Sequence, residues 1–188
     1  FGGNVEVPSI AILPLDNMGD KEDEFYAYGI SSDLIADVAG AGLIRVAGLK
    51  DIEKLDYKNL NYKELANKLS VRYIGQGTVW KKDSVFQLSM ELYDVKTAKV
   101  TWAERWQKNW SELTSIKGVL ADNILNSLKV SLEQDITKVY STNAEAYEYY
   151  LRAKFIYELD YENEDTSNNN IKIIRDLLAK AIELDANL

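Results

Sequence analysis

The sequence contains no cysteine and no histidine among its 188 residues. These absences exclude thiol nucleophiles, disulfides and imidazole bases, and they remove the usual ligands of zinc and copper sites. The lack of cysteine also fits an oxidising compartment, where stray thiols are hazardous. Most familiar catalytic constellations need one of these residue types, so we expect no enzymatic activity and no cofactor.

Long hydrophobic runs are absent as well, since the longest one, residues 10–15, is only strand-sized. A membrane-spanning helix needs about 20 apolar residues, so we expect no direct membrane insertion of this chain. Positive charge is scarce: 22 Lys and Arg stand against 30 Asp and Glu, which gives a formal net charge of −8. That field repels phosphate backbones, and we expect no nucleic-acid partner.

Acidic residues cluster in one loop between Asp16 and Glu24. Clustered carboxylates are the ligands that calcium prefers. An EF-hand loop, however, needs an oxygen ligand at its third position and glycine at its sixth, where this loop has Met18 and Lys21. We interpret the cluster as a solvated charge run and predict no metal site.

Strand and helix patterns alternate in the first part of the chain. Residues 9–15 form a continuous apolar run, which is typical of a central strand covered on both faces. Apolar residues at helical spacing follow from Phe25 to Val38, and residues 43–47 return as a short strand. This order predicts a right-handed crossover between two parallel strands. Residues 62–70 predict a second, short helix.

The pattern changes to period two at residues 86–92, which indicates a half-exposed strand. Residues 73–80 and 99–106 complete an antiparallel meander around it. Gly75 and Gly77 lie in its first strand without a Walker or dinucleotide motif, so they indicate close strand approach or a bulge. A long amphipathic helix follows from Trp110, with Leu120 in the middle of its apolar stripe.

No strand signal follows residue 139: a break at residues 140–143 leads to two predicted helices, residues 144–159 and 171–184, around the polar loop 160–170. The sequence therefore predicts two domains. Residues 1–139 form an α/β domain whose mixed sheet has a parallel βαβ start and an antiparallel meander. Residues 140–188 form an all-α helical hairpin. Its tyrosines cannot all face one way, and exposed tyrosine is typical of contact surfaces, so Tyr149 and Tyr150 are candidate partner-binding residues.

Four segments in order resemble the TolB amino-terminal-like domain, which occurs in bacterial proteins described as adenylate cyclases, membrane-anchored regulators and tetratricopeptide proteins. They are residues 9–17, 25–35, 71–79 and 101–105. The hairpin resembles a tetratricopeptide repeat, with Tyr149, Ala153 and Ile156 at first-helix positions and residues 181–187 at the repeat end. Ala186 replaces the usual proline of that ending, and the loop 160–170 makes the unit longer than a standard repeat.

The resemblance implies a non-catalytic protein-interaction or sensory module of a larger bacterial signalling protein. A cyclase activity would belong to a part outside this chain, since no metal-binding acids are arranged for it here. One helix pair cannot bury its own stacking face, so we expect further repeats. The alternative is a small-molecule sensor that binds its ligand at the carboxyl ends of the parallel strands, near Asp16, Asn17 and Gly48.

We expect the module to act outside the cytoplasm, in the periplasm, held by an anchor that precedes Phe1. The absent cysteine, the resemblance to a domain of a periplasmic protein and a start without methionine favour this location. A cytoplasmic scaffold is the alternative. In either location the expected partners are proteins.

Overall fold

The computed structural model describes residues 7–42, 44–130, 141–163 and 168–188. The strands are β1 Ser9–Ile12, β2 Asp16–Asn17, β3 Arg45–Val46, β4 Tyr73–Lys82, β5 Val85–Asp94 and β6 Lys99–Asn109. The helices are α1 Glu24–Gly40, α2 Leu49–Glu53, α3 Tyr62–Leu69, α4 Leu113–Ser127, α5 Ala144–Asn163 and α6 Asn168–Leu184. Short 3-10 turns occupy Lys21–Asp23, Tyr57–Asn59 and Trp110–Glu112.

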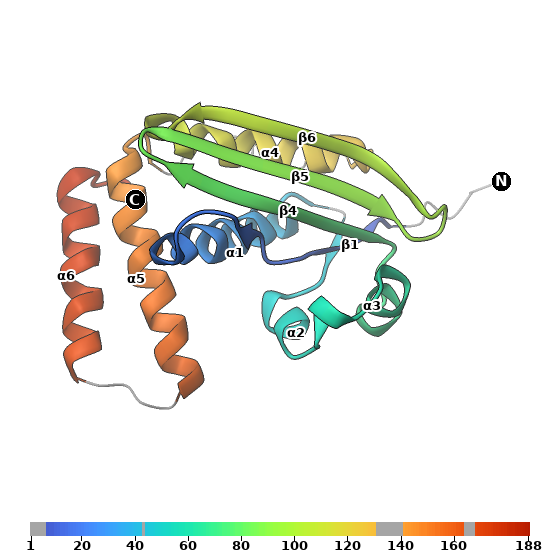
Figure 1. Cartoon of the computed structure of the whole chain (residues 1–188), viewed down its shortest axis with the longest axis horizontal. Helices are drawn as coiled ribbons and strands as arrows, with labels where there is room; N and C mark the ends of the chain where they lie inside the picture. The colour runs from blue at the N-terminus through green and yellow to red at the C-terminus, as the bar shows by residue number, and fades with distance from the viewer. Residues whose placement is uncertain (1–6, 43, 131–140, 164–167) are drawn as a thin grey trace.

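The strands form one mixed sheet in the order β3-β1-β4-β5-β6, with β2 paired to β4 (Figure 1). Strand β1 runs parallel to both β3 and β4, and α1 lies between β1 and β3 in the chain. Strands β4, β5 and β6 are antiparallel neighbours. The predicted parallel start, the meander and the mixed α/β class are therefore confirmed.

Two hydrophobic cores lie on opposite faces of the sheet, because alternate side chains of a strand point to opposite sides. Ile10 and Ile12 belong to the larger core, which α1, α4 and α5 cover. Ala11 and Leu13 belong to the smaller core, under α2 and α3. This explains why residues 9–15 have no polar alternation: the central strand is buried on both faces.

Close packing of β4 on β5 accounts for the two glycines. A Cβ atom on Gly75 would lie 2.9 Å from the Met90 side chain, and one on Gly77 would collide with the carbonyl oxygen of Ser89. The expected close approach of the strands is confirmed. The long helix α4 is confirmed, but it begins at Leu113, after a 3-10 turn at Trp110–Glu112 that Asn109 and Glu112 close with a reciprocal capping box.

The structure differs from the prediction in two short segments. The first strand ends at Ile12, followed by one more hydrogen bond from Leu13 N to Gly75 O at 2.8 Å, and pairing with β4 resumes at Asp16–Asn17. Pro14 lies between these two strands and has no N–H to give to a ladder. Helix α2 was not predicted, because its five residues are too few to show a helical period.

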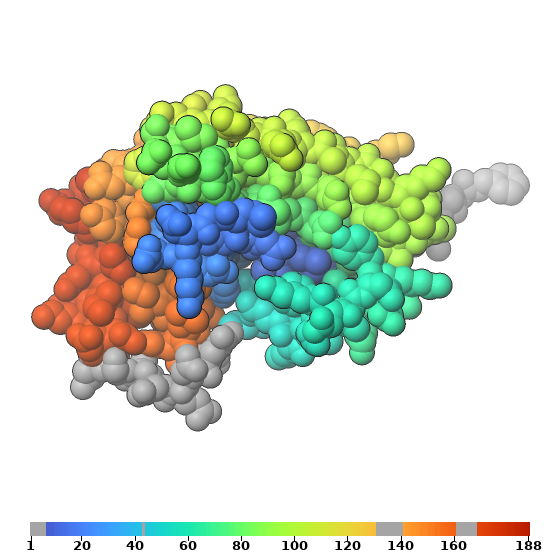
Figure 2. Space-filling model, viewed as in Figure 1, coloured from blue at the N-terminus to red at the C-terminus, as the bar shows by residue number. Residues whose placement is uncertain are grey.

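The helices α5 and α6 lie side by side at one end of the molecule (Figures 1 and 2). Helix α5 begins at the predicted residue and runs four residues past the predicted end, to Asn163. Tyr147 and Leu151 of α5 join the same core as α1 and the sheet. The predicted boundary at residue 139 lies outside the described residues, and the assignment to a tetratricopeptide repeat stays a prediction.

In the parts of the chain that the structure describes, every helix is too short or too polar to cross a membrane.

Arg72 and Asp94 join the start of β4 to the end of β5. The guanidinium donates two hydrogen bonds to the carboxylate, at 3.1 and 2.8 Å. These hydrogen bonds hold the pKa of Asp94 below its ordinary value. A depressed pKa contributes stability above the unfolded-state pKa, about 4, and that stability is lost as the pH falls through the folded-state pKa.

We expect Asp94→Asn to lower the free energy of unfolding by about 1.5–3 kcal/mol at pH 7, because a charged hydrogen-bond acceptor is lost. The difference from the unmodified chain should shrink as the pH falls below about 4, where the wild-type carboxylate also takes up a proton. Urea unfolding between pH 3 and pH 7 measures both effects. A difference that stays constant over this range would contradict the assignment to the carboxylate.

Candidate functional site: the helix pair and its two faces

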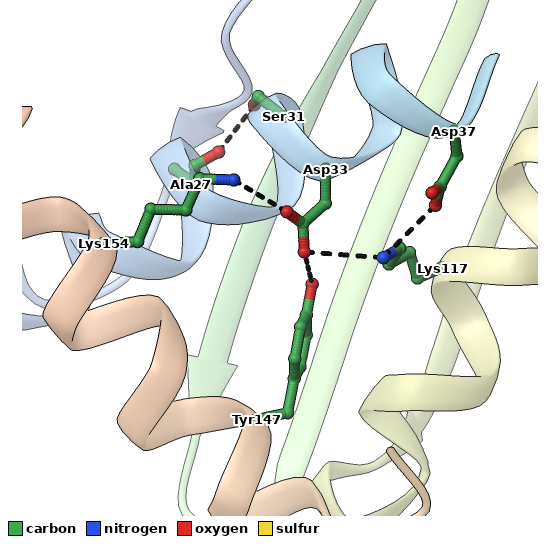
Figure 3. Close-up of polar contacts among 7 residues, drawn as sticks. All are labelled: Ala27, Ser31, Asp33, Asp37, Lys117, Tyr147 and Lys154. Carbon is green, nitrogen blue, oxygen red and sulfur yellow. Dashed lines mark hydrogen bonds and ion pairs between the residues drawn. The ribbon is translucent and has the colours of Figure 1, made fainter. Parts of the chain in front are cut away.

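One face of α5 is fastened to α1 and α4 by a buried ionic cluster (Figure 3). The carboxylate of Asp33, in α1, accepts hydrogen bonds from Tyr147 Oη at 2.6 Å and Lys154 Nζ at 2.8 Å. Lys117, in α4, lies 3.5 Å from the same carboxylate and 3.2 Å from that of Asp37. Asp33 is thus the hub that joins three helices.

Electrostatics fix the protonation of this cluster. Burial and the neighbouring Asp33 charge raise the pKa of Tyr147 well above its ordinary value, so the phenol keeps its proton and donates it. Burial disfavours the charge on Lys154, but Asp33 outweighs it and raises the pKa of that amine. Burial raises the pKa of Asp37, against the opposing charge of Lys117.

The hydrogen bonds and ion pairs of this cluster clamp α5 onto α1 and α4. Its donors already point at its acceptors, and the cavity beside it, lined in part by Asp33, Lys117 and Tyr150, holds only about 270 Å³. None of its residues is a thiol, an imidazole or an activated hydroxyl, and Tyr147 is held protonated. The cluster therefore positions α5 and does not assemble a nucleophile beside a base.

A second set of contacts holds the same helix face. Tyr26 Oη donates to Glu148, and Trp110 Nε1 donates to Tyr26 Oη at 2.9 Å. Glu148 also accepts two hydrogen bonds from Arg152, one turn later on α5. Burial and the hydrogen bond to Glu148 raise the pKa of Tyr26 far above its ordinary value. One side of α5 is accordingly fixed to the α/β part of the chain.

At Gly29, α1 packs closely against Leu151 of α5. A Cβ atom there would lie 2.5 Å from Leu151 Cδ2 and 3.3 Å from its Cβ and Cγ. We expect Gly29→Ala to lower the free energy of unfolding by about 1–3 kcal/mol, since overpacking forces the two helices apart. Gly40→Ala is the matched control in the same helix, because its Cβ would meet nothing within 4 Å. Equal stability of the two variants in urea would contradict this close contact.

The other face of the helix pair is apolar, and no residue in the described parts of the chain covers it. Along α6, apolar residues recur at spacings of three and four, which places them on one side of the helix. They line a groove of about 730 Å³ whose walls are Tyr157, Asp160, Ile171, Ile174, Arg175, Leu178, Ala179 and Ile182. Ile182 is 56% exposed and Leu178 37% exposed. Exposed large apolar side chains that gather in one groove are typical of contact surfaces.

The structure separates the two tyrosines proposed for partner binding. Tyr150 is half-buried, stacks on Tyr147 with ring centroids 6.0 Å apart and packs against the core. Tyr149 is also half-buried and does not line the α5–α6 groove. Tyr157, on the same helix, does line it. Their role in binding stays a prediction.

The residues proposed for the small-molecule alternative do not come together in one cavity. Asp16 is exposed and borders a polar cleft of about 490 Å³ on the open face of the sheet, with Gln76, Glu91 and Arg105 among its other walls. Gly19 N donates a hydrogen bond to Asn17 Oδ1 at 2.9 Å, so the Asn17 side chain caps the turn that follows it. Gly48 precedes α2 as its N-cap. Neither Asn17 nor Gly48 lines that cleft.

Sequence reasoning missed the groove residues of α6 and the hub Asp33. A readable signal existed for the groove, because Ile171, Ile174, Leu178 and Ile182 follow helical spacing. No sequence pattern points to Asp33, because it is one of 30 acidic residues. Its partners Tyr147 and Lys154 are more than a hundred residues away in the chain. Among the described residues, no group of three or more acidic residues could hold a metal ion.

Comparison with known proteins finds one relative by sequence and a solved structure with a similar fold. No family model matches the chain. A Rhizobium meliloti protein named "Putative adenylate cyclase 3" is 29% identical over 126 residues, which are 66% of this chain and 22% of that protein. The chain thus spans about a fifth of the length of this relative.

One solved structure shares part of the fold, and a second one superposes less well. TolB from Acinetobacter baumannii superposes with a TM-score of 0.50 at 18% identity, over 65% of this chain and 28% of TolB. A lipoprotein from Neisseria meningitidis gives a TM-score of 0.46 at 13% identity, over 65% of this chain and 98% of that one. The likeness to TolB agrees with the resemblance noted from the sequence and concerns the fold alone.

Proposed function

We propose that this chain is a non-catalytic protein-interaction module of a larger bacterial signalling protein, and that the α5–α6 groove receives an amphipathic helix. The observation that carries the proposal is the uncovered apolar groove beside a helix that is itself firmly held. The relative named "Putative adenylate cyclase 3", which is several times longer than the matched region, supports a signalling context. The cyclase chemistry would belong to another part of such a protein.

The energetics favour occupancy of this groove. Burying a Leu or Ile side chain contributes about 1.5–3 kcal/mol, and several such side chains line the groove. An amphipathic helix presents apolar residues at the same spacing of three and four, so it matches the stripe on α6. The next helical unit of a tetratricopeptide array would use this face in the same way, and we propose that the hairpin is the first unit of such an array.

We expect Leu178→Asp in the full-length protein to reduce recovery of its helical partner roughly tenfold or more, because a carboxylate would have to be buried in the groove. Quantitative affinity capture under native conditions measures the recovery, and thermal unfolding checks the fold. Lys180→Asp is the matched control on the far side of α6, and it should bind as the unmodified protein does. Equal recovery with both variants, at equal stability, would exclude the groove as the partner face.

The second candidate function is that of a small-molecule sensor, whose ligand would bind in the polar cleft bordered by Asp16. Its open face carries side-chain pairs that already bond one another, such as Thr78 and Ser89 at 2.6 Å. A ligand would have to replace these bonds. A thermal-shift screen with a saturable rise, lost in Asp16→Ala, would favour this function, since a ligand of the native state raises its stability.

We propose an extracytoplasmic location for the module, with the cytoplasm as the alternative. The absent cysteine and the TolB-like fold support the proposal. A reporter that is active only after export, fused after Leu188 in the full-length protein, tests it. A silent reporter there, with a second fusion near the native amino terminus that behaves as cytoplasmic, would rule the extracytoplasmic location out.

A further inference from the structure

Strand β6 forms one edge of the sheet and is long and open. It runs for eleven residues, Lys99–Asn109, and it stands at the end of the strand order next to β5 (Figure 1). Nine of its residues are exposed, and the other two, Trp102 and Trp106, are half-buried. Among the described residues, no strand pairs with its outer side. A strand edge of this kind is a template for pairing with another chain.

The register shows which backbone groups point outward. In an antiparallel ladder, residue pairs that exchange hydrogen bonds alternate with pairs that do not. Trp110 N donates to Ser84 O at 2.7 Å, so this pair is of the first kind. Counting back along the regular register, Lys108, Trp106 and Glu104 bond to β5 in the same way.

The residues between them turn their backbone groups away from β5. They are Ala103, Arg105 and Gln107, which face Glu91, Ser89 and Gln87 in the pairs that exchange no hydrogen bonds. Each offers one N–H and one C=O to the open side. The irregularity in the ladder lies at Leu92/Tyr93, beyond these three residues. Three evenly spaced residues can therefore bond one added strand.

The two sides of this edge differ in chemistry, which restricts what an added strand carries. On the side of the larger core, the ring centroids of Trp102 and Trp106 lie 6.0 Å apart, and both side chains pack against that core. Val119 of α4 is 46% exposed and lies one turn before Asn123, which bonds Glu104 of β6. An added strand would therefore meet Trp102, Trp106 and Val119 on this side, with Glu104, held by Asn123, between the two tryptophans.

The opposite side carries one basic residue of β6, Arg105, beside the exposed Ala103 and Gln107, and the acidic Glu91 and Asp16 border the same cleft farther from the edge. Strand β6 as a whole has three basic residues, Lys99, Arg105 and Lys108, and one acidic residue, Glu104. The entire chain, in contrast, carries a net charge of −8. A second copy of this chain would bring another basic strand to this edge, and like charges directly opposite each other are destabilising.

We propose that β6 binds an extended, acidic segment of a partner protein by strand addition, with acidic residues facing Arg105 and alternate apolar residues facing Trp102, Trp106 and Val119. Main-chain hydrogen bonds to Ala103, Arg105 and Gln107 supply affinity, and the alternation of charge and apolar surface supplies specificity. This site is separate from the α5–α6 groove and stands on different residues.

The test uses the complete 188-residue chain and a labelled peptide of alternating valine and glutamate. Fluorescence anisotropy should rise and saturate with this peptide, and it should rise far less with the matching peptide of valine and lysine. Ala103→Pro removes one outward N–H without touching the ladder to β5, where proline on an edge strand is tolerated. It should weaken binding roughly tenfold, since it removes a backbone hydrogen bond and crowds the edge. Ala103→Val keeps the N–H and should bind like the unmodified chain.

Thermal unfolding of the two variants shows that the sheet is intact, and Leu178→Asp in the groove should leave peptide binding unchanged. No saturable binding of the acidic peptide would overturn the proposal. So would equal binding of the acidic and basic peptides, or equal affinity of the proline and valine variants. Sedimentation that shows a dimer broken by Ala103→Pro would also overturn it, because the edge would then belong to a second copy of the chain.

Discussion

The Asp33→Ala variant is expected to lose about 3–5 kcal/mol of unfolding free energy, because it removes one partner of a buried charge cluster. Lys154 is mostly buried and would remain charged without the carboxylate that faces it, and Lys117, also mostly buried, would keep only Asp37. Tyr147 would also lose the acceptor of its hydroxyl, which lies 2.6 Å away. Urea denaturation at pH 7 measures the loss.

Asp20→Ala is the matched control for Asp33→Ala, since Asp20 is an exposed aspartate just ahead of α1. A change within about 0.5 kcal/mol is expected there, as for most surface substitutions. A loss below about 1 kcal/mol for Asp33→Ala would show that the two lysines do not depend on this carboxylate. The clamp between α1, α4 and α5 would then have to rest on apolar packing alone.

Leu120→Ala is expected to cost about 2–5 kcal/mol, because it leaves a cavity under the sheet that its neighbours fill only in part. Leu120 is fully buried in the larger core, in the middle of α4. Val119→Ala is the matched control, since the adjacent side chain is 46% exposed and its loss should cost far less. A change near zero for Leu120→Ala would mean that α4 does not present this face to the sheet.

Most of the sheet and its helices could be predicted from the sequence, because hydrophobic periodicity reports which face of an element is buried. The alternation at residues 86–92 reappears as alternate burial along β5. The unbroken apolar run at residues 9–15 reappears as a strand with a core on each face. The segments that were missed, β2 and α2, are too short for any period to show.

The docking of α5 could not be predicted in the same way. It depends on contacts such as Tyr147 with Asp33, whose residues are 114 apart in the chain, and periodicity carries no information about such pairs. The abundance of tyrosine on α5 drew attention to Tyr149 and Tyr150, yet Tyr150 packs inward beside Tyr147. The spacing of isoleucine and leucine along α6 was the better signal, since it defines a stripe that no described residue covers.

Site-specific photo-crosslinking in the full-length protein tests the proposed partner face most directly. A photoreactive side chain in place of Ile182 would lie in the groove, whereas one in place of Asp176, an exposed residue on the far side of α6, would not. Crosslinks from position 182 to a helix of a partner or of a further repeat, without crosslinks from position 176, are the predicted result. Equal yields at both positions, or no protein adduct at position 182, would contradict a protein-binding groove on this helix pair.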